Sequence, residues 1–166
     1  KVIFIKYSND FYNSLPHTHK LYMILPEYMY KNLNKNISTV IHEFVHIHQR
    51  IYKLKYINFY KSINYIYAKK IDNFKTMLNL NRMNPDNLDN SWVWKDPYED
   101  NKYYWTGAVF NSENAYSLLD AQNIAYPLEI SENDNTFVYS NKAPILLSNL
   151  DSFKKYFGIS GNNYDP

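Results

Sequence analysis

Residues 39–52, TVIHEFVHIHQRIY, carry three of the five histidines in the chain and decide how the rest of the sequence is interpreted. Within this stretch His42, Glu43 and His46 form the pattern H-E-x-x-H. A helix advances by about 100° per residue, so His42 and His46 project from one side, a turn apart. Two imidazoles in this arrangement can bind one zinc ion. The stretch therefore predicts a helix that presents part of a zinc site.

Glu43 is the candidate for the chemical step. On the same helix it lies about 100° from His42 and about 60° from His46, so it can border a zinc ion without binding it. A carboxylate in that position can accept a proton from a zinc-bound water. We expect Glu43 to be the general base of a zinc-dependent hydrolase.

The helix has a second, apolar side. Ile41, Phe44 and Ile51 fall roughly opposite the histidine pair, so we expect the helix to bury this side and to open the other to a cleft. His48 lies on the apolar side, which excludes it as a zinc ligand and predicts a packed histidine. Arg50 returns to the side of the pair, where it is expected to anchor a neighbouring loop or carboxylate.

A catalytic zinc site needs a third protein ligand and a fourth position for water. The chain has no cysteine, so this ligand must be a histidine or a carboxylate. The longer pattern H-E-x-x-H-x-x-G-x-x-H is excluded, because Gln49 and Tyr52 stand where it needs glycine and histidine.

Our prediction for the third ligand is Glu129, in the segment YPLEISEN. Pro127 can begin a helix there, which would place Glu129 in the first turn. Glu132 and Asp134, about one turn further on, are the alternatives. Tyr126, the first residue of this segment, is a candidate electrophilic partner of the zinc.

His17 and His19 alternate with Thr18, so in a strand both would point to one face. Such a pair can form a second metal site, or line the cleft and donate to a developing oxyanion. We expect the commoner arrangement, in which both histidines are simply exposed.

The composition limits the class of protein. The chain has 166 residues, which favours a single domain over residues 1–166. The formal charge is +2, from 18 basic and 16 acidic residues, and this balance indicates neither nucleic acid nor a membrane surface. We therefore expect neither nucleic acid nor a membrane as partner. A peptide or protein substrate is implied only by the resemblance described below.

The pattern of residues predicts both strands and helices. We expect a strand over residues 1–7 and an apolar run over 19–30 that ends or bends at Pro26. Residues 27–84 contain neither glycine nor proline and are predicted to be mainly helical. Segments 91–95, 102–110 and 115–126 suggest strands, and a final helix over 148–158 should end at Gly158.

Three segments together resemble a known group of enzymes. HEFVHIHQR at 42–50, NPD at 84–86 and YPLE at 126–129 are similar to motifs of zincin-like metallopeptidases of the gluzincin type. Uncharacterised members of this group, several of them encoded by large DNA viruses, show the closest pattern. The resemblance implies that zinc is bound by His42, His46 and Glu129 and that Glu43 is the base. Residues 84–86 have no role derived from the sequence beyond a turn beside the cleft.

The resemblance also implies an α+β zincin-like fold, in which a small, mostly antiparallel sheet packs on the HExxH helix and on further helices. The expected function is zinc-dependent hydrolysis of peptide bonds. Two alternatives stay open. One is an inactive interaction domain that keeps a structural zinc site, and the other is a zinc amidase that acts on a non-peptide substrate.

Overall fold

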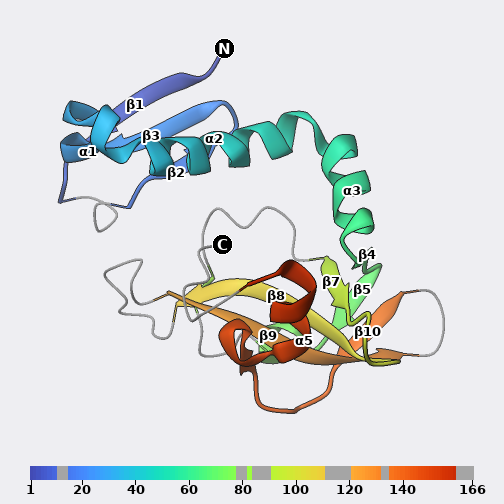
Figure 1. Cartoon of the computed structure of the whole chain (residues 1–166). Coiled ribbons are helices and arrows are strands. Elements are labelled where there is room, and N and C mark those ends of the chain that lie inside the picture. The colour runs from blue at the N-terminus through green and yellow to red at the C-terminus, as the bar shows by residue number, and fades with distance from the viewer. Residues whose placement is uncertain (11–14, 78–81, 84–90, 111–120, 132–134, 160–166) are drawn as a thin grey trace. The chain divides into compact units, whose positions relative to one another are not determined.

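The computed structural model describes residues 1–10, 15–77, 82–83, 91–110, 121–131 and 135–159 (Figure 1). The described residues fall into two compact units. The first is Lys1–Ile57, and the second comprises the described residues from Asn58 onward. The expectation of a single zincin-like domain over residues 1–166 stays a prediction.

The first unit consists of a three-stranded sheet and the helices that follow it (Figure 1). The sheet order is β1-β3-β2, with β1 parallel and β2 antiparallel to the central strand. The elements are β1 (Ile3–Tyr7), β2 (His17–His19), β3 (Tyr22–Pro26), α1 (Glu27–Lys31), a 3-10 turn (Leu33–Asn36), α2 (Ile37–Ile51) and α3 (Lys53–Ser62), whose last residues belong to the second unit.

Helix α2 packs on the three-stranded sheet through Ile47, which is fully buried against Met23 and Leu25 of β3. The expectation that the apolar side of this helix would be buried is therefore wrong. Ile41 and Phe44 remain 56% and 48% exposed, because the helix turns its Glu43–Ile47 side to the sheet instead.

The second unit is built on an eight-stranded, mostly antiparallel sheet. The main path runs β4-β7-β8-β9-β10-β5, with β11 added to β9 and β6 to β8, and only the β5–β10 pair is parallel among these strands. Its strands are β4 (Tyr65–Tyr67), β5 (Lys70–Asp72), β6 (Arg82–Met83), β7 (Trp92–Lys95), β8 (Tyr103–Phe110), β9 (Ala121–Ser131), β10 (Thr136–Tyr139) and β11 (Ile145–Leu146). Its remaining helices are α4 (Phe74–Met77), a 3-10 turn (Leu147–Asn149) and α5 (Asp151–Phe157).

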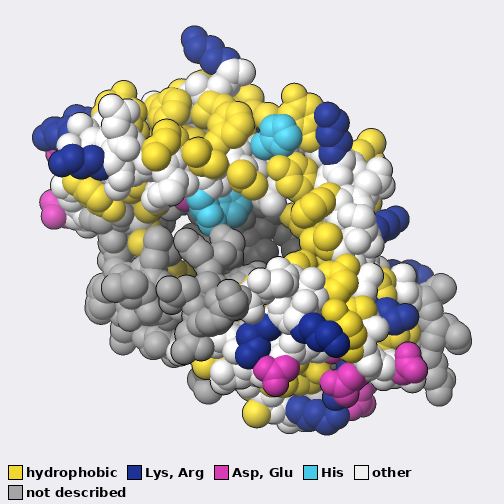
Figure 2. Space-filling view, in the orientation of Figure 1, with side chains coloured by type: hydrophobic (Ala, Val, Ile, Leu, Met, Phe, Trp, Pro, Cys, Tyr) yellow, Lys and Arg dark blue, Asp and Glu magenta, His cyan; other side chains and the backbone are white. Residues whose placement is uncertain are grey.

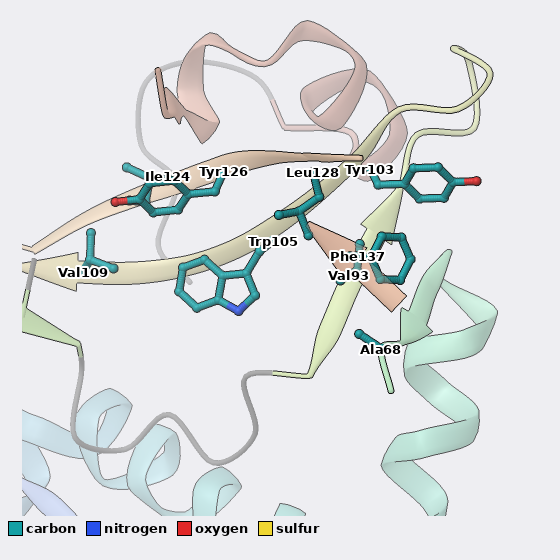
Figure 3. Close-up of a cluster of buried hydrophobic side chains, with 9 residues drawn as sticks. All are labelled: Ala68, Val93, Tyr103, Trp105, Val109, Ile124, Tyr126, Leu128 and Phe137. Atoms are coloured by element: carbon teal, nitrogen blue, oxygen red, sulfur yellow. The ribbon is translucent and has the colours of Figure 1, made fainter. Parts of the chain in front are cut away.

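Two aromatic clusters fill the core of the second unit. Figure 3 shows the first, in which Trp105 of β8 and Phe137 of β10 are almost completely buried. In the second cluster, Trp94 of β7 meets Phe153 of α5 with ring centroids 5.0 Å apart. Gly107 is part of this packing, because a Cβ there would lie 2.6 Å from the Trp105 ring. The large number of aromatic residues is thus used mainly here.

The broad fold prediction is confirmed, since the structure is α+β with a mostly antiparallel sheet. The strands predicted over 1–7, 91–95 and 102–110 are present, and the one predicted over 115–126 is present from Ala121 onward. The last helix ends at Gly158, which adopts the left-handed conformation at φ 66° that glycine tolerates best.

The prediction that residues 27–84 are mainly helical fails in its second half. The helical run ends at Ser62, Asn64 turns the chain in a left-handed conformation, and β4 begins at Tyr65. Tyr65, Ile66 and Tyr67 are aromatic and β-branched residues that favour strands, and they pair with β7. The absence of glycine and proline was therefore a poor guide, because asparagine makes the turn.

The helix predicted to begin at Pro127 is also wrong, because Pro127 and Glu129 lie within the long strand β9. This strand is paired on both sides, with Tyr104 of β8 opposite Pro127 and Val138 of β10 opposite Glu129. Pairing on two edges outweighs the local preference of a proline for the first turn of a helix.

Candidate metal centre

The histidine pair has the geometry of two ligands that converge on one point. The His42 Nε2 and His46 Nε2 atoms are 3.0 Å apart, and the rings meet edge to face at 81° with centroids 4.7 Å apart. Two nitrogens that share a tetrahedral zinc, each at about 2.0–2.1 Å, are separated by about 3.3 Å. The pair therefore fits a shared metal ion with a change of a few tenths of an ångström.

Glu43 occupies the side of α2 that faces the three-stranded sheet. Its exposed fraction is only 3%, whereas His42 is exposed and His46 half-buried. The pKa of Tyr7, at the end of β1, is raised to about 12, first by burial and then by the negative charges of ionised Tyr28 and of Glu43. The carboxylate of Glu43 thus lies within electrostatic range of β1.

Arg50 holds α2 against β2. Its guanidinium donates to the Thr18 hydroxyl at 2.8 Å and to the Thr18 carbonyl at 3.3 Å, and Thr18 is buried. The prediction of an anchoring role for Arg50 is confirmed, although the partner is a strand and not a loop or a carboxylate. These two bonds fix the rotation of the helix, and with it the direction in which the histidine pair points.

His17 and His19 lie on strand β2, so the prediction that they share a face holds. His19 is exposed as expected, but His17 is half-buried. The Leu15 carbonyl accepts hydrogen bonds from His17 Nδ1 at 3.2 Å and from the Tyr7 hydroxyl at 2.6 Å.

Tyr7 is a residue that the sequence did not identify, since nothing in its spacing distinguishes it among 18 tyrosines. His48 behaves as predicted. It is half-buried, its Nδ1 lies 3.1 Å from the Tyr56 hydroxyl, and its ring packs on Tyr52 with centroids 4.4 Å apart. It takes no part in the His42–His46 pair.

No third zinc ligand can be assigned among the described residues. Glu129 is exposed on β9 in the second unit, where its carboxylate lies 4.0 Å from the Lys142 ammonium. Within the described part of the chain, no three histidine or carboxylate side chains are grouped closely enough to hold a metal ion. The alternatives Glu132 and Asp134, and residues 84–86, lie outside the described residues. Glu129 therefore stays a prediction.

Tyr126, the candidate electrophilic partner, has a packing role in the structure. It is 3% exposed and lies in the core of the second unit, with its ring 5.9 Å from that of Trp105 and 5.8 Å from that of Tyr139. Its position next to the predicted ligand segment was therefore a weak signal.

Comparison of the chain with protein-family models, with curated proteins and with solved structures found no match. The function of the chain is therefore inferred from the motif in α2 and from its geometry.

Proposed function

We propose that the chain is a zinc-dependent peptidase of the zincin-like, gluzincin type. The observation that carries the proposal is the convergence of His42 Nε2 and His46 Nε2, which are 3.0 Å apart on one helix. A buried carboxylate, Glu43, lies between the two histidines in sequence. Histidine pairs at this spacing with an adjacent glutamate are the ligand-and-base set of zinc peptidases.

In this proposal His42, His46 and Glu129 hold the zinc ion. A zinc ion so bound lowers the pKa of its water toward about 7 and polarises the substrate carbonyl. Glu43 accepts the proton of the attacking water and delivers it to the leaving amine.

The arrangement of the first unit supports a zincin-like fold. Its small sheet packs on α2 through Met23, Leu25 and Ile47, as expected for a sheet that covers an HExxH helix. Arg50 fixes the helix to β2, so the histidine pair stands on a supported element.

The experiment compares zinc content and peptide cleavage across α2 variants. Glu43→Gln should retain zinc and lose about 10²–10⁴-fold in turnover of an unbiased peptide library, because the general base is removed. His46→Gln should lose zinc. His48→Gln is the matched control on the same helix and should keep zinc, because His48 bonds Tyr56. Cleavage by Glu43→Gln at the parental rate would rule out the assigned base.

Glu129→Ala tests the third ligand. Zinc affinity should fall by at least about tenfold, because the site is left with two protein ligands. Glu99→Ala is the matched control, since Glu99 is also an exposed carboxylate paired with a lysine, Lys102. Undiminished zinc affinity in Glu129→Ala would move the ligand to Glu132 or to another residue.

A second candidate is an inactive interaction domain that keeps a structural zinc. Exposed apolar side chains on the first unit favour it, among them Ile37, Ile41 and Phe44. Zinc content is the same in both cases, so cleavage of the peptide library with and without chelator separates them. A zinc amidase would leave peptides intact but would still need Glu43.

A further inference from the structure

Helix α2 and the start of α3 expose a continuous set of apolar side chains, which we call the outer face. Figure 2 shows hydrophobic side chains gathered over the part of the surface where Figure 1 places α2. The exposed fractions of its members range from 39% to 78%. The outer face consists of Ile37, Ile41, Phe44, Val45, Ile51, Tyr52 and Leu54.

The outer face is separate from the histidine pair. A helix advances by about 100° per residue around its axis. On this basis Tyr52 and the members on α2 fall within an arc of about 120°. The centre of the arc lies about 140° around the axis from the midpoint of His42 and His46. Glu43 and Ile47, on the sheet side of the helix, fall outside this arc. A body that rests on the outer face therefore leaves the histidine pair uncovered.

Positive charge lies at the α3 end of the outer face. Between Ile37 and Ile57 the chain has three basic residues and a single acidic one, Glu43, which is buried. Arg50 is bonded to Thr18 of β2, whereas Lys53 and Lys55 are exposed next to Tyr52 and Leu54 in the sequence.

The near-neutral total charge conceals this segregation. Residues 1–57 carry 8 basic and 3 acidic residues, a net charge of +5, whereas residues 58–166 carry 10 and 13, a net charge of −3. Such asymmetry between parts of a chain indicates interaction with an anionic surface. The expectation that no membrane takes part was drawn from the total of +2, which averages the two parts.

We propose that the outer face docks the protein on an anionic lipid surface. An exposed apolar helix side with lysines beside it is the chemistry of helices that lie in the plane of a membrane interface. At one end of the face the Lys55 ammonium lies 5.0 Å from the centre of the Tyr52 ring. Tyrosine and lysine both place an apolar stem in lipid and a polar tip among the headgroups.

The charge also decides against a second copy of this chain as the occupant. Two outer faces placed together would bring two sets of lysines into one interface without an exposed carboxylate from this segment to balance them. An anionic lipid surface supplies the balancing charge. No helix in the described part of the chain is long and apolar enough to cross a bilayer.

Sedimentation of the full chain with vesicles tests the proposal. Vesicles of phosphatidylcholine with about 30% phosphatidylserine should bind the protein, and pure phosphatidylcholine vesicles should bind it far less. The double variant Ile41→Gln/Phe44→Gln should bind about tenfold more weakly. Lys53→Gln and Lys55→Gln should each weaken binding about fivefold, and salt should weaken it further.

Ile130→Gln is the matched control, because Ile130 is an isoleucine of similar exposure on β9 in the second unit. It should bind vesicles like the parent. Circular dichroism of every variant separates loss of docking from loss of folding. Glu43→Gln should also bind vesicles like the parent. The docking proposal and the peptidase proposal are therefore tested independently.

Three results would overturn the proposal. The first is absence of binding to phosphatidylserine vesicles, with or without binding to an acidic polypeptide such as polyglutamate. The second is binding that the folded Ile41→Gln/Phe44→Gln variant retains in full. The third is a dimer of the parent, seen by light scattering, that the same double variant converts to a monomer.

Discussion

The two units of this protein use their apolar residues in opposite ways. The second unit buries its aromatic side chains in two clusters, with Trp94, Trp105 and Phe137 almost fully covered. The first unit has one small cluster of Met23, Leu25 and Ile47. Most of the apolar side chains of α2 are instead exposed.

This difference separates the unit with the larger core from the unit that carries the histidine pair. Burial of apolar surface is the main source of stability, so we expect core packing to contribute more free energy in the second unit than in the first. The first unit holds the histidine pair on a helix that is fixed by a small core and by the Arg50–Thr18 bonds. Its exposed apolar residues are then available for contact with something outside the unit.

The largest expected effect on stability comes from replacing a phenylalanine by alanine, a substitution that can be made in each unit. Phe137→Ala should lower the free energy of unfolding by about 3–5 kcal/mol, because Phe137 is fully buried against Tyr103. Phe44→Ala should change it by no more than about 0.5 kcal/mol, because Phe44 is half exposed on a helix where alanine is favourable. Urea denaturation measures both.

An equally large loss of stability in Phe44→Ala would erase the contrast between the units. It would mean that the outer face is covered within the folded chain, and the docking proposal would fail with it.

A smaller effect is expected at the contact between α2 and β2. Arg50→Met removes two hydrogen bonds from a charged donor to Thr18 and should cost about 1–3 kcal/mol. Lys53→Met, three positions on and exposed, is the control and should be close to neutral. Hydrogen exchange across α2 should be faster in Arg50→Met alone. Unchanged exchange in that variant would show that the small core holds the helix without these bonds.

The smallest effect concerns pH. The pKa of Tyr7 is raised to about 12 in the folded protein, above the value of about 10 for an unfolded tyrosine. The folded state therefore binds the proton more tightly, and this stability is complete below pH 10 and is lost as the pH rises through about 12. Partial exposure of Tyr7 limits the loss to about 1 kcal/mol or less.

Tyr7→Phe should remove this part of the pH dependence. The free energy of unfolding, measured by denaturant titration at pH 9 and pH 11, should fall less in the variant than in the parent. The same fall in both proteins would place the titrating group elsewhere.

The sequence was most successful where one local rule acts alone. The spacing of His42 and His46 fixes their common side on any helix, and the structure brings their Nε2 atoms within 3.0 Å. Gly158 likewise ends α5 because its left-handed conformation suits glycine. These predictions needed no knowledge of distant residues.

The sequence was misleading where pairing with a distant strand competes with a local signal. Pro127 can start a helix, but pairing of β9 with both β8 and β10 makes this segment a strand. The location of Glu129 on a strand was therefore beyond local rules. The hydrogen bond from Tyr7 to the Leu15 carbonyl could not be predicted either, because no spacing rule links residues that are eight positions apart.

The sequence by itself determined the α+β class, the helix with its histidine pair and a segregation of charge that the total conceals. Only the tertiary structure decided which side of α2 is buried. Periodicity shows that a helix has an apolar side, but burial depends on the surface that the rest of the chain offers. Here Ile47 packs against β3 and Arg50 donates hydrogen bonds to Thr18 of β2, so the most apolar side of the helix remains exposed.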